Sequence, residues 1–297
     1  MPHIGGMPHI GGMPRMKTRK HRYLAPGPKV CHPRLKGVND TCLPRTLLDT
    51  LGDALHAPKM LSEPNLRAWI RRRTRCKTER CWLEKAPLDP VKKKEIIKMY
   101  FRPTMPDSWL ANPNVWLDSN DINKVMKQYE ETYPNFKYFG TNPIDFSSPS
   151  PYIEGSKEKK ICLQDEICKL NLKDMLSKGV TKLGFVYNLD PSDKEGSHWI
   201  ASFIDIPAKK HYYFDSYGMS PPHQVSRFMK ALTLQEPSMK LYNNAKRLQF
   251  GDSECGVYCL YFIIRMLEGD DFKKFCRRAP TDSDIKDIRK WIFSAKE

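Results

Sequence analysis

Cys255 occupies the position in this chain that best suits a nucleophile. It follows a polar turn at residues 251–254 and stands in the first turn of an apolar run, 254–269, that predicts a buried helix. The N-terminus of a helix stabilises a thiolate over a thiol, and the thiolate is the reactive form of cysteine. The small Gly256 beside it would leave room for a substrate carbonyl. On its own, however, a buried cysteine is usually an inert core residue.

A cysteine nucleophile needs a base, and the base needs a partner that orients it. His198 begins the strand-like run 198–206, and Asp215 lies near the end of the next run, 211–216. If the two runs pair as antiparallel neighbours, these side chains fall near the same end of the sheet. The carboxylate would then hold the imidazole in the tautomer that accepts the proton of Cys255.

Gln249 completes the predicted catalytic set. It lies six residues before Cys255, across the short polar turn. Its side-chain N–H could point at the oxygen that becomes negative when a thiolate attacks a carbonyl. Together with the backbone N–H of Cys255, it would form an oxyanion hole.

Other residues of the same types compete for these roles. His211 and His223 are alternative bases, Asp205 is an alternative acid, and Cys259 follows Cys255 by one helical turn. Cys259 would lie further inside the protein and is interpreted as a core residue.

The composition is that of a folded chain in which we expect no membrane helix. The 297 residues include 13 Phe, 13 Tyr and 6 Trp, and no apolar run approaches the roughly 20 residues of a transmembrane helix. The N-terminus lacks a hydrophobic signal core, and nine cysteines is an odd number. These features favour an intracellular, reducing compartment and free thiols.

Positive charge is concentrated in the front of the chain. Residues 1–110 hold 23 Lys and Arg against nine Asp and Glu, whereas the remainder holds 27 against 25. Such asymmetry indicates two functional parts, and the basic residues within 15–102 could contact DNA or an acidic protein. The alternative is a solvated basic face that only aids solubility.

Periodicity and punctuation divide the chain into three segments. Residues 1–30, with a tandem MPHIGG repeat and scattered Gly and Pro, predict a flexible basic arm. Residues 31–105 predict a small helical basic domain, with helices near 43–55, 64–75 and 90–102. Residues 106–297 predict a second domain in which helices precede strands and further helices follow. This order is typical of an α+β fold.

The arrangement of the candidate residues resembles a known group of enzymes. The residues HW (198–199), YYFDSYG (212–218) and LQFGDSECGVY (248–258) are similar to the signature of the SUMO-protease and adenovirus-protease group of cysteine peptidases, as is WLDSNDIN (116–123). The resemblance covers 106–297. It implies a ubiquitin-like-protease or adenain-type core, with a central mixed sheet flanked by helices. It also places the base with the following Trp, at His198 rather than His211.

The front of the chain resembles a narrower group. The residues NDTCLPRTLLDTL (39–51) and CKTERCW (76–82) are similar to the arm domain of the polyprotein-processing protease of African swine fever virus. The chain is thereby similar to the maturation cysteine proteases of large nucleocytoplasmic DNA viruses. That enzyme has Asn as the third triad member, whereas this chain has Asp215, as the SUMO proteases do.

The resemblance implies a substrate and a place of action. Enzymes of this group cleave after Gly-Gly, and Trp199 would cover a channel too narrow for larger side chains. The expected activity is thiol endopeptidase cleavage of viral structural polyproteins during virion maturation, in the host cytoplasm and the virion. Gly6 and Gly12, each followed by Met, would be sites of self-cleavage; a harmless repeat expansion is the alternative.

Other functions remain open at this point. A SUMO-type isopeptidase would also recognise Gly-Gly, and a non-catalytic basic interaction protein could retain the same fold. No cofactor and no metal are expected. A structural zinc site would have to come from Cys31, His32, Cys42, Cys76 and Cys81, whose spacing is looser than usual for zinc. Free thiols packed between helices are the preferred interpretation.

Overall fold

The computed structural model describes residues 23–35 and 41–295. The tandem repeat with Gly6 and Gly12 lies outside these residues, so the predicted self-cleavage sites are not described. Within the described ranges, no helix has the length and apolar character needed to cross a membrane.

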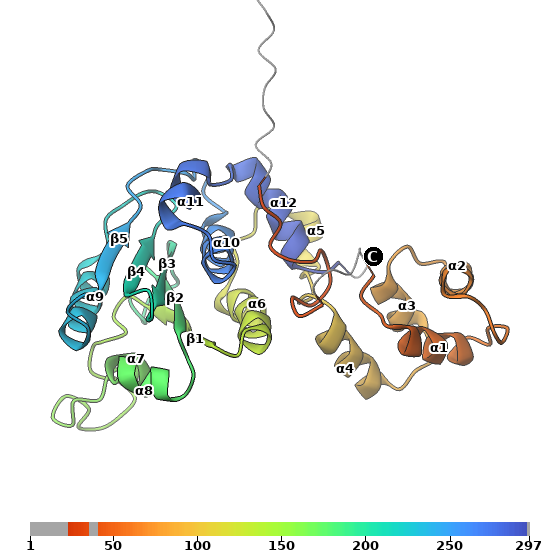
Figure 1. Ribbon diagram of the computed structural model, residues 1–297, viewed down its shortest axis with the longest axis horizontal. Coiled ribbons are helices and arrows are strands. Elements are labelled where there is room, and N and C mark those ends of the chain that lie inside the picture. Colours follow the sequence, from red (N-terminus) through yellow and green to blue (C-terminus); the bar gives the residue numbers. More distant parts are fainter. Residues whose placement is uncertain (1–22, 36–40, 296–297) are drawn as a thin grey trace, which may run out of the picture.

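A five-stranded mixed sheet forms the centre of the larger part of the molecule (Figure 1). The strands lie in chain order: β1 (Phe136–Pro143), β2 (Lys182–Asn188), β3 (Trp199–Asp205), β4 (Lys210–Phe214) and β5 (Lys240–Asn243). The β2–β3 and β3–β4 pairs are antiparallel, whereas β1–β2 and β4–β5 are parallel. This confirms the predicted α+β class with a mixed sheet flanked by helices.

The two faces of the sheet carry alternate residues of the same strands. In β3, Ala201 and Phe203 join the core under α10 (Cys255–Leu267), whereas Ile200 and Ile204 join the core under α9 (His223–Gln235). This period of two is the pattern of a strand buried on both faces.

Helix α10 is apolar all round because it lies inside the protein. All 13 of its residues are buried, and it packs on β3 between the sheet, α6 and α12. A helix without a polar face is expected only in such a position. The first residue of α10 is Cys255, so the candidate nucleophile is held by a fully enclosed helix.

The surrounding helices begin where the sequence provides caps. Helices α6 (Ser119–Thr132) and α12 (Asp282–Ile292) both start with a capping box, from Asp118 and Thr281 respectively. The other helices of this part are α5 (Ser108–Ala111), α7 (Asp165–Cys168), α8 (Leu172–Ser177) and α11 (Phe272–Arg278).

Four helices near the front of the chain share a hydrophobic cluster of their own, formed by residues between Cys31 and Phe101. They are α1 (Arg45–Ala54), α2 (Glu63–Thr74), α3 (Glu79–Lys85) and α4 (Pro90–Tyr100), and they form a separate group in Figure 1. Three match the predicted helices, and α3 was not predicted because it is only seven residues long. The domain boundaries at 30 and 105 stay predictions.

Residues 23–30, within the predicted flexible arm, lie against the larger part of the molecule. Three aromatic side chains donate hydrogen bonds to this segment: Tyr261 to the carbonyl of Leu24, Tyr129 to that of Pro26 and Trp291 to that of Gly27. These bonds satisfy backbone carbonyls that Pro and Gly leave outside regular secondary structure.

The cysteines correct one expectation from the sequence. Six of them form disulfides, Cys31–Cys42, Cys76–Cys81 and Cys162–Cys168, with Cα–Cα distances of 5.2, 5.6 and 6.4 Å. The prediction of free thiols was therefore wrong for these six. Four of the thiols considered for zinc are paired with one another. Cys255, Cys259 and Cys276 are free.

Gly218 provides a test of the turn that follows β4. Its φ is +74°, and an added Cβ would lie 2.7 Å from the carbonyl carbon of Lys246 and 2.8 Å from the backbone nitrogen of Arg247. Backbone cannot yield as a side chain can, so we expect Gly218→Ala to lower the free energy of unfolding by about 2–4 kcal/mol.

Gly179 is the matched control, with φ +77° and no atom within 4 Å of an added Cβ. Gly179→Ala should lower the free energy of unfolding by only about 1 kcal/mol, which is the cost of holding an alanine in the left-handed backbone conformation. Denaturant unfolding of both variants measures the difference, and equal losses would contradict the close approach at Gly218.

Candidate active site

His198 and Asp215 are brought together by the pairing of β3 and β4. His198 immediately precedes β3 and Asp215 immediately follows β4, and these strands are antiparallel neighbours, as the sequence predicted. His198 Nε2 lies 2.7 Å from Asp215 Oδ1, and the two side chains are only 7% and 1% exposed. A carboxylate at this distance fixes both the orientation and the tautomer of the ring.

Cys255 lies close enough to the imidazole to affect its titration. Burial lowers the pKa of His198, but hydrogen bonds to Asp215 and Cys255, with the negative charge of both, outweigh it and raise this pKa to about 9. Since Asp215 takes Nε2, Nδ1 is the ring nitrogen left for the thiol. A proton can thus pass from sulfur to a ring that is stabilised in its charged form.

Tyr217 stacks on the His198 ring, with ring centroids 4.4 Å apart and planes inclined by 17°. Its backbone N–H also donates to Asp215 Oδ1, at 2.8 Å. No role was predicted for Tyr217 from the sequence, although it stands inside the YYFDSYG stretch. An aromatic residue two positions after the candidate acid was the signal available.

Asn244 holds the backbone of Asp215 on the opposite side. Its Oδ1 accepts a hydrogen bond from Asp215 N at 2.9 Å, and its Nδ2 donates to Asp215 O at 2.6 Å. Asn244 is 2% exposed and follows β5, directly beside β4. The sequence analysis missed it, because its contacts are to backbone atoms and no side-chain motif announces them.

Gln249 is fully buried and its amide is fixed at both ends. Ser216 Oγ donates to Oε1 at 2.7 Å, and Nε2 donates to the carbonyl of Gly251 at 2.9 Å. The hydroxyl thus determines which end of the amide carries the donors. Because Nε2 has two hydrogens and Gly251 takes one, the second is available to another acceptor.

The turn between Gln249 and Cys255 is anchored by Asp282 of α12. Asp282 Oδ2 accepts from the backbone nitrogens of Phe250 and Gly251, at 2.9 Å each, and Oδ1 accepts from Tyr258 OH. One carboxylate therefore ties this turn to α10 and α12.

Trp199 and Gly256 both contact Leu117. Trp199 Nε1 donates to the Leu117 carbonyl at 2.9 Å, and a Cβ added to Gly256 would lie 3.0 Å from Leu117 Cβ. In this structure the small size of Gly256 admits the side chain of Leu117. Room for a substrate carbonyl beside Gly256 stays a prediction.

The site is tightly enclosed. Cys255 is 1% exposed, Trp199 6% and Gln249 0%. A polypeptide reaches the sulfur only through a narrow approach or a local opening, so bulky side chains next to the reacting carbonyl are disfavoured.

The competing residues occupy other environments. Among the described residues, neither ring nitrogen of His211 has a hydrogen-bond partner; this ring is fully buried on the α9 side of the sheet, and burial lowers its pKa to about 3. His223 is exposed at the start of α9, and Asp205 accepts from Ala208 N in the β3–β4 turn. Burial raises the pKa of the Cys259 thiol well above its ordinary value. None of the four has the partners that His198 has.

Comparison with known proteins identifies the domain. Residues 188–297 match the model of the Ulp1 protease family, C-terminal catalytic domain. This stretch contains all four candidate catalytic residues and the turn anchored by Asp282. Residues 188–297 are thus similar to the catalytic domain of this family of cysteine peptidases.

Two viral proteins are among its relatives. A protein of Acanthamoeba polyphaga mimivirus, described as a thiol protease, is 33% identical over 188 residues, which are 60% of this chain and 56% of that protein. A SUMO-1 cysteine protease of African swine fever virus is 27% identical over 177 residues, 57% of this chain and 58% of that protein. The match thus spans a little over half the length of each relative.

A solved structure shares the fold. The crystal structure of an African swine fever virus protease has a TM-score of 0.62 and 19% sequence identity, over 91% of this chain and 97% of that one. The likeness of fold therefore extends beyond the peptidase domain, into the helices near the front of the chain.

The environment of His198 predicts an unusual titration. We expect its ring to remain protonated at neutral pH and to titrate at about 9, whereas His211 should stay neutral until the pH approaches about 3. Because the folded pKa lies above the ordinary value of about 6.5, protonated His198 contributes stability that is complete below pH ~6.5 and is lost as the pH rises through about 9.

Proton–carbon NMR spectra of the histidine rings measure both values. Asp215→Asn should move the His198 titration to lower pH and leave His211 unchanged. A His198 midpoint of about 6.5 in the unsubstituted protein, the ordinary value for histidine, would contradict the pairing with Cys255 and Asp215.

Proposed function

We propose that this protein is a thiol endopeptidase in which Cys255 is the nucleophile and His198 the general base. The observation that carries the proposal is the convergence of an imidazole held by Asp215 with a free thiol at the first residue of a buried helix. A free thiol next to an oriented base is the arrangement that nucleophilic catalysis requires.

The chemistry follows from these positions. Cys255 Sγ, having lost its proton to His198, attacks the carbonyl carbon of the scissile peptide bond. Gln249 Nε2 and the backbone N–H of Cys255 stabilise the oxyanion. His198 returns the proton to the leaving amine, and a thioester remains. His198 then takes a proton from water, whose oxygen attacks the thioester. The carboxylic acid leaves, and the Cys255 thiolate beside the protonated His198 is regenerated.

Asp215, Tyr217 and Asn244 act through other residues in this scheme. Asp215 holds the ring and stabilises its charged form, Tyr217 restricts the tilt of the ring by stacking, and Asn244 keeps the Asp215 backbone in register with β5. Ser216 orients the Gln249 amide so that nitrogen rather than oxygen faces the site.

We propose Gly-Gly as the cleavage signal and viral structural polyproteins as the substrates. The enclosure of Cys255 supports a preference for residues without side chains, since only these let the backbone approach a sulfur that is 1% exposed. The viral relatives support a role in virion maturation, in host cytoplasm and virion.

Removal of a ubiquitin-like modifier is the second candidate. Such modifiers would present the same Gly-Gly signal, and the related African swine fever virus protein is described as a SUMO-1 cysteine protease. A purely non-catalytic, basic interaction protein is disfavoured, because it would have no need to keep a free thiol against an oriented imidazole. DNA contact through residues 15–102 stays a prediction.

Peptide cleavage is the direct test. The full-length protein should cut a Gly-Gly-Met peptide after the second Gly and should leave an Ala-Ala-Met peptide intact. The Cys255→Ala variant should cut neither peptide. A SUMO vinyl-sulfone probe separates the two candidates, because labelling at Cys255 supports modifier removal. If neither peptide nor probe reacts with the folded protein, the enzyme proposal is wrong.

The same samples test self-cleavage at Gly6 and Gly12. The intact mass of the unsubstituted protein should be lower than that of Cys255→Ala by the mass of residues 1–6 or of residues 1–12. If each protein has the mass calculated for its own full-length chain, self-cleavage is excluded and the peptidase proposal still stands.

The oxyanion role of Gln249 predicts a specific kinetic change. Gln249→Ala should lower kcat by about 10²–10³-fold with little change in KM, because the lost donor acts on charge that develops only in the transition state. Ser216→Ala should lower kcat by a smaller factor, and Ser216→Thr, which keeps the hydroxyl, should restore part of it. Loss of affinity at unchanged kcat would instead indicate that Gln249 binds the ground state.

A further inference from the structure

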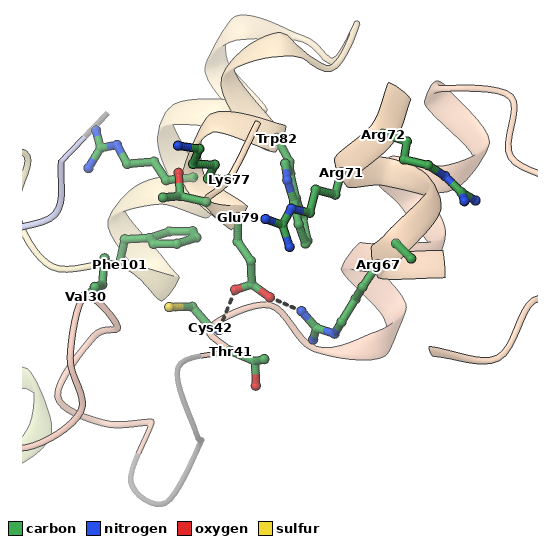
Figure 2. A pocket seen from close by; sticks show the side chains of 13 residues that line it. Val30, Thr41, Cys42, Arg67, Arg71, Arg72, Lys77, Glu79, Trp82 and Phe101 are labelled. Atoms are coloured by element: carbon green, nitrogen blue, oxygen red, sulfur yellow. Dashed lines mark hydrogen bonds and ion pairs between the residues drawn. The ribbon is translucent and has the colours of Figure 1, made fainter. Parts of the chain in front are cut away.

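The helices near the front of the chain line a hollow that is separate from the candidate active site. It has a volume of about 580 Å³ and lies between α2, α3 and the residues that precede α1 (Figure 2). Its volume falls within the range of small-molecule and short-peptide sites. None of the candidate catalytic residues lines it.

Three exposed cationic side chains line this hollow. Arg71, Arg72 and Lys77 line it and are exposed, and within the described part of the chain no carboxylate forms an ion pair with any of them. Figure 2 shows the guanidinium of Arg71 directed over the hollow and that of Arg72 turned outward. Cations gathered without partners favour an anionic ligand.

The acidic residue in the hollow is already used. Glu79 accepts hydrogen bonds from the backbone nitrogens of Cys42 and Leu43, at 2.6 and 3.1 Å, and it pairs with Arg67. It is 9% exposed. The Glu79 carboxylate is therefore already paired with Arg67 and with two backbone N–H groups, and it does not neutralise Arg71 or Lys77.

The inner wall is apolar and aromatic. Trp82 and Phe101 contribute to it but are only 5% and 2% exposed, and the Trp82 indole N–H donates to the Cys76 carbonyl at 3.1 Å. Rings covered to this extent offer no open face on which a nucleobase could stack. The small parts of these rings that remain exposed form, together with Val30, an apolar surface for one side chain that does not need to stack face to face.

Two disulfides hold the walls of the hollow in place. Cys42 lines it and is bonded to Cys31, and Lys77 stands inside the short loop closed by Cys76–Cys81. A site whose walls are covalently linked loses less conformational entropy when a ligand binds.

From these contacts we propose that the hollow binds an acidic peptide segment carrying one apolar side chain. Carboxylates of the segment pair with Arg71 and Lys77, with Arg72 at the edge, and the apolar side chain rests against Trp82 and Phe101. A peptide fits better than nucleic acid, because the cations surround an apolar hollow rather than following a continuous stripe. The binding itself does not depend on the proposed peptidase function.

Fluorescence anisotropy with the full-length Cys255→Ala protein tests the proposal. The probe is a fluorescein-labelled decapeptide of alternating Asp and Glu with a central Leu-Phe. We expect a Kd of about 10 μM at roughly 50 mM NaCl, and the double variant Arg71→Glu/Lys77→Glu should raise this Kd by about tenfold or more.

The double variant Arg73→Glu/Lys92→Glu is the matched control. Both of its residues are exposed, neither lines the hollow, and the change in net charge is the same. This control should leave the Kd within about twofold of the starting value. Equal weakening by the two double variants would overturn the proposal and leave only non-specific attraction to a basic surface.

Two further probes test the chemistry of the ligand. A decapeptide with Gly-Ser in place of Leu-Phe should bind about fivefold more weakly or worse, and unchanged affinity would exclude the apolar wall. A labelled single-stranded decanucleotide should bind more weakly than the acidic peptide. If the nucleotide binds more tightly than the peptide, and the double variant Arg71→Glu/Lys77→Glu abolishes that binding, the ligand of the hollow is nucleic acid and the peptide proposal is wrong.

Because Cys255→Ala is used throughout, these outcomes are independent of catalysis. Failure of peptide binding leaves the peptidase proposal intact, and failure of the peptidase assays leaves the binding site intact.

Discussion

The hydrogen bond between His198 and Asp215 is the interaction on which the site depends. Two ionisable groups that are 7% and 1% exposed lose most of their hydration, and only close mutual contact offsets that cost. The antiparallel register of β3 and β4 provides the contact, since one residue precedes a strand and the other follows its neighbour. The surrounding contacts, from Tyr217 and Asn244, then keep the pair aligned toward the first residue of α10.

Helix α12 connects the segments that must stay in register around Cys255. Asp282 holds the turn before the nucleophile through two backbone N–H groups, at the N-terminal end of the helix. Further along the same helix, Arg289 donates to the carbonyls of Pro113 and Val115 and lies 4.0 Å from Glu254. Burial raises the pKa of Glu254, and Arg289 opposes that shift. The acidic neighbour of Cys255 is therefore compensated by a cation from the same helix that fixes the turn.

The sequence predicted the parts of this structure that residue type and spacing determine. The strands around His198 and Asp215 and the buried helix from Cys255 follow from local patterns. Asn244 and Asp282 were missed because they hold backbone atoms, and such contacts leave no spacing rule in the chain. The disulfides were missed for a related reason: pairing depends on whether two Cα atoms come within about 4.4–6.8 Å of each other, which only the fold decides.

The basic front third illustrates how the fold divides charges that look alike in the sequence. Arg102 is 1% exposed, donates to Tyr129 and to the carbonyl of Pro26, and so joins the helical part to the residues beside α10. Arg80, also buried, donates to Thr104 and Ser294. These two cations are structural and are not available to a ligand. Arg71 and Lys77, a few residues away in the chain, keep their charge at the surface over an apolar wall. Net charge alone therefore overstates the positive surface, and the cations that can meet a partner are the ones that the fold leaves unpaired around a hollow.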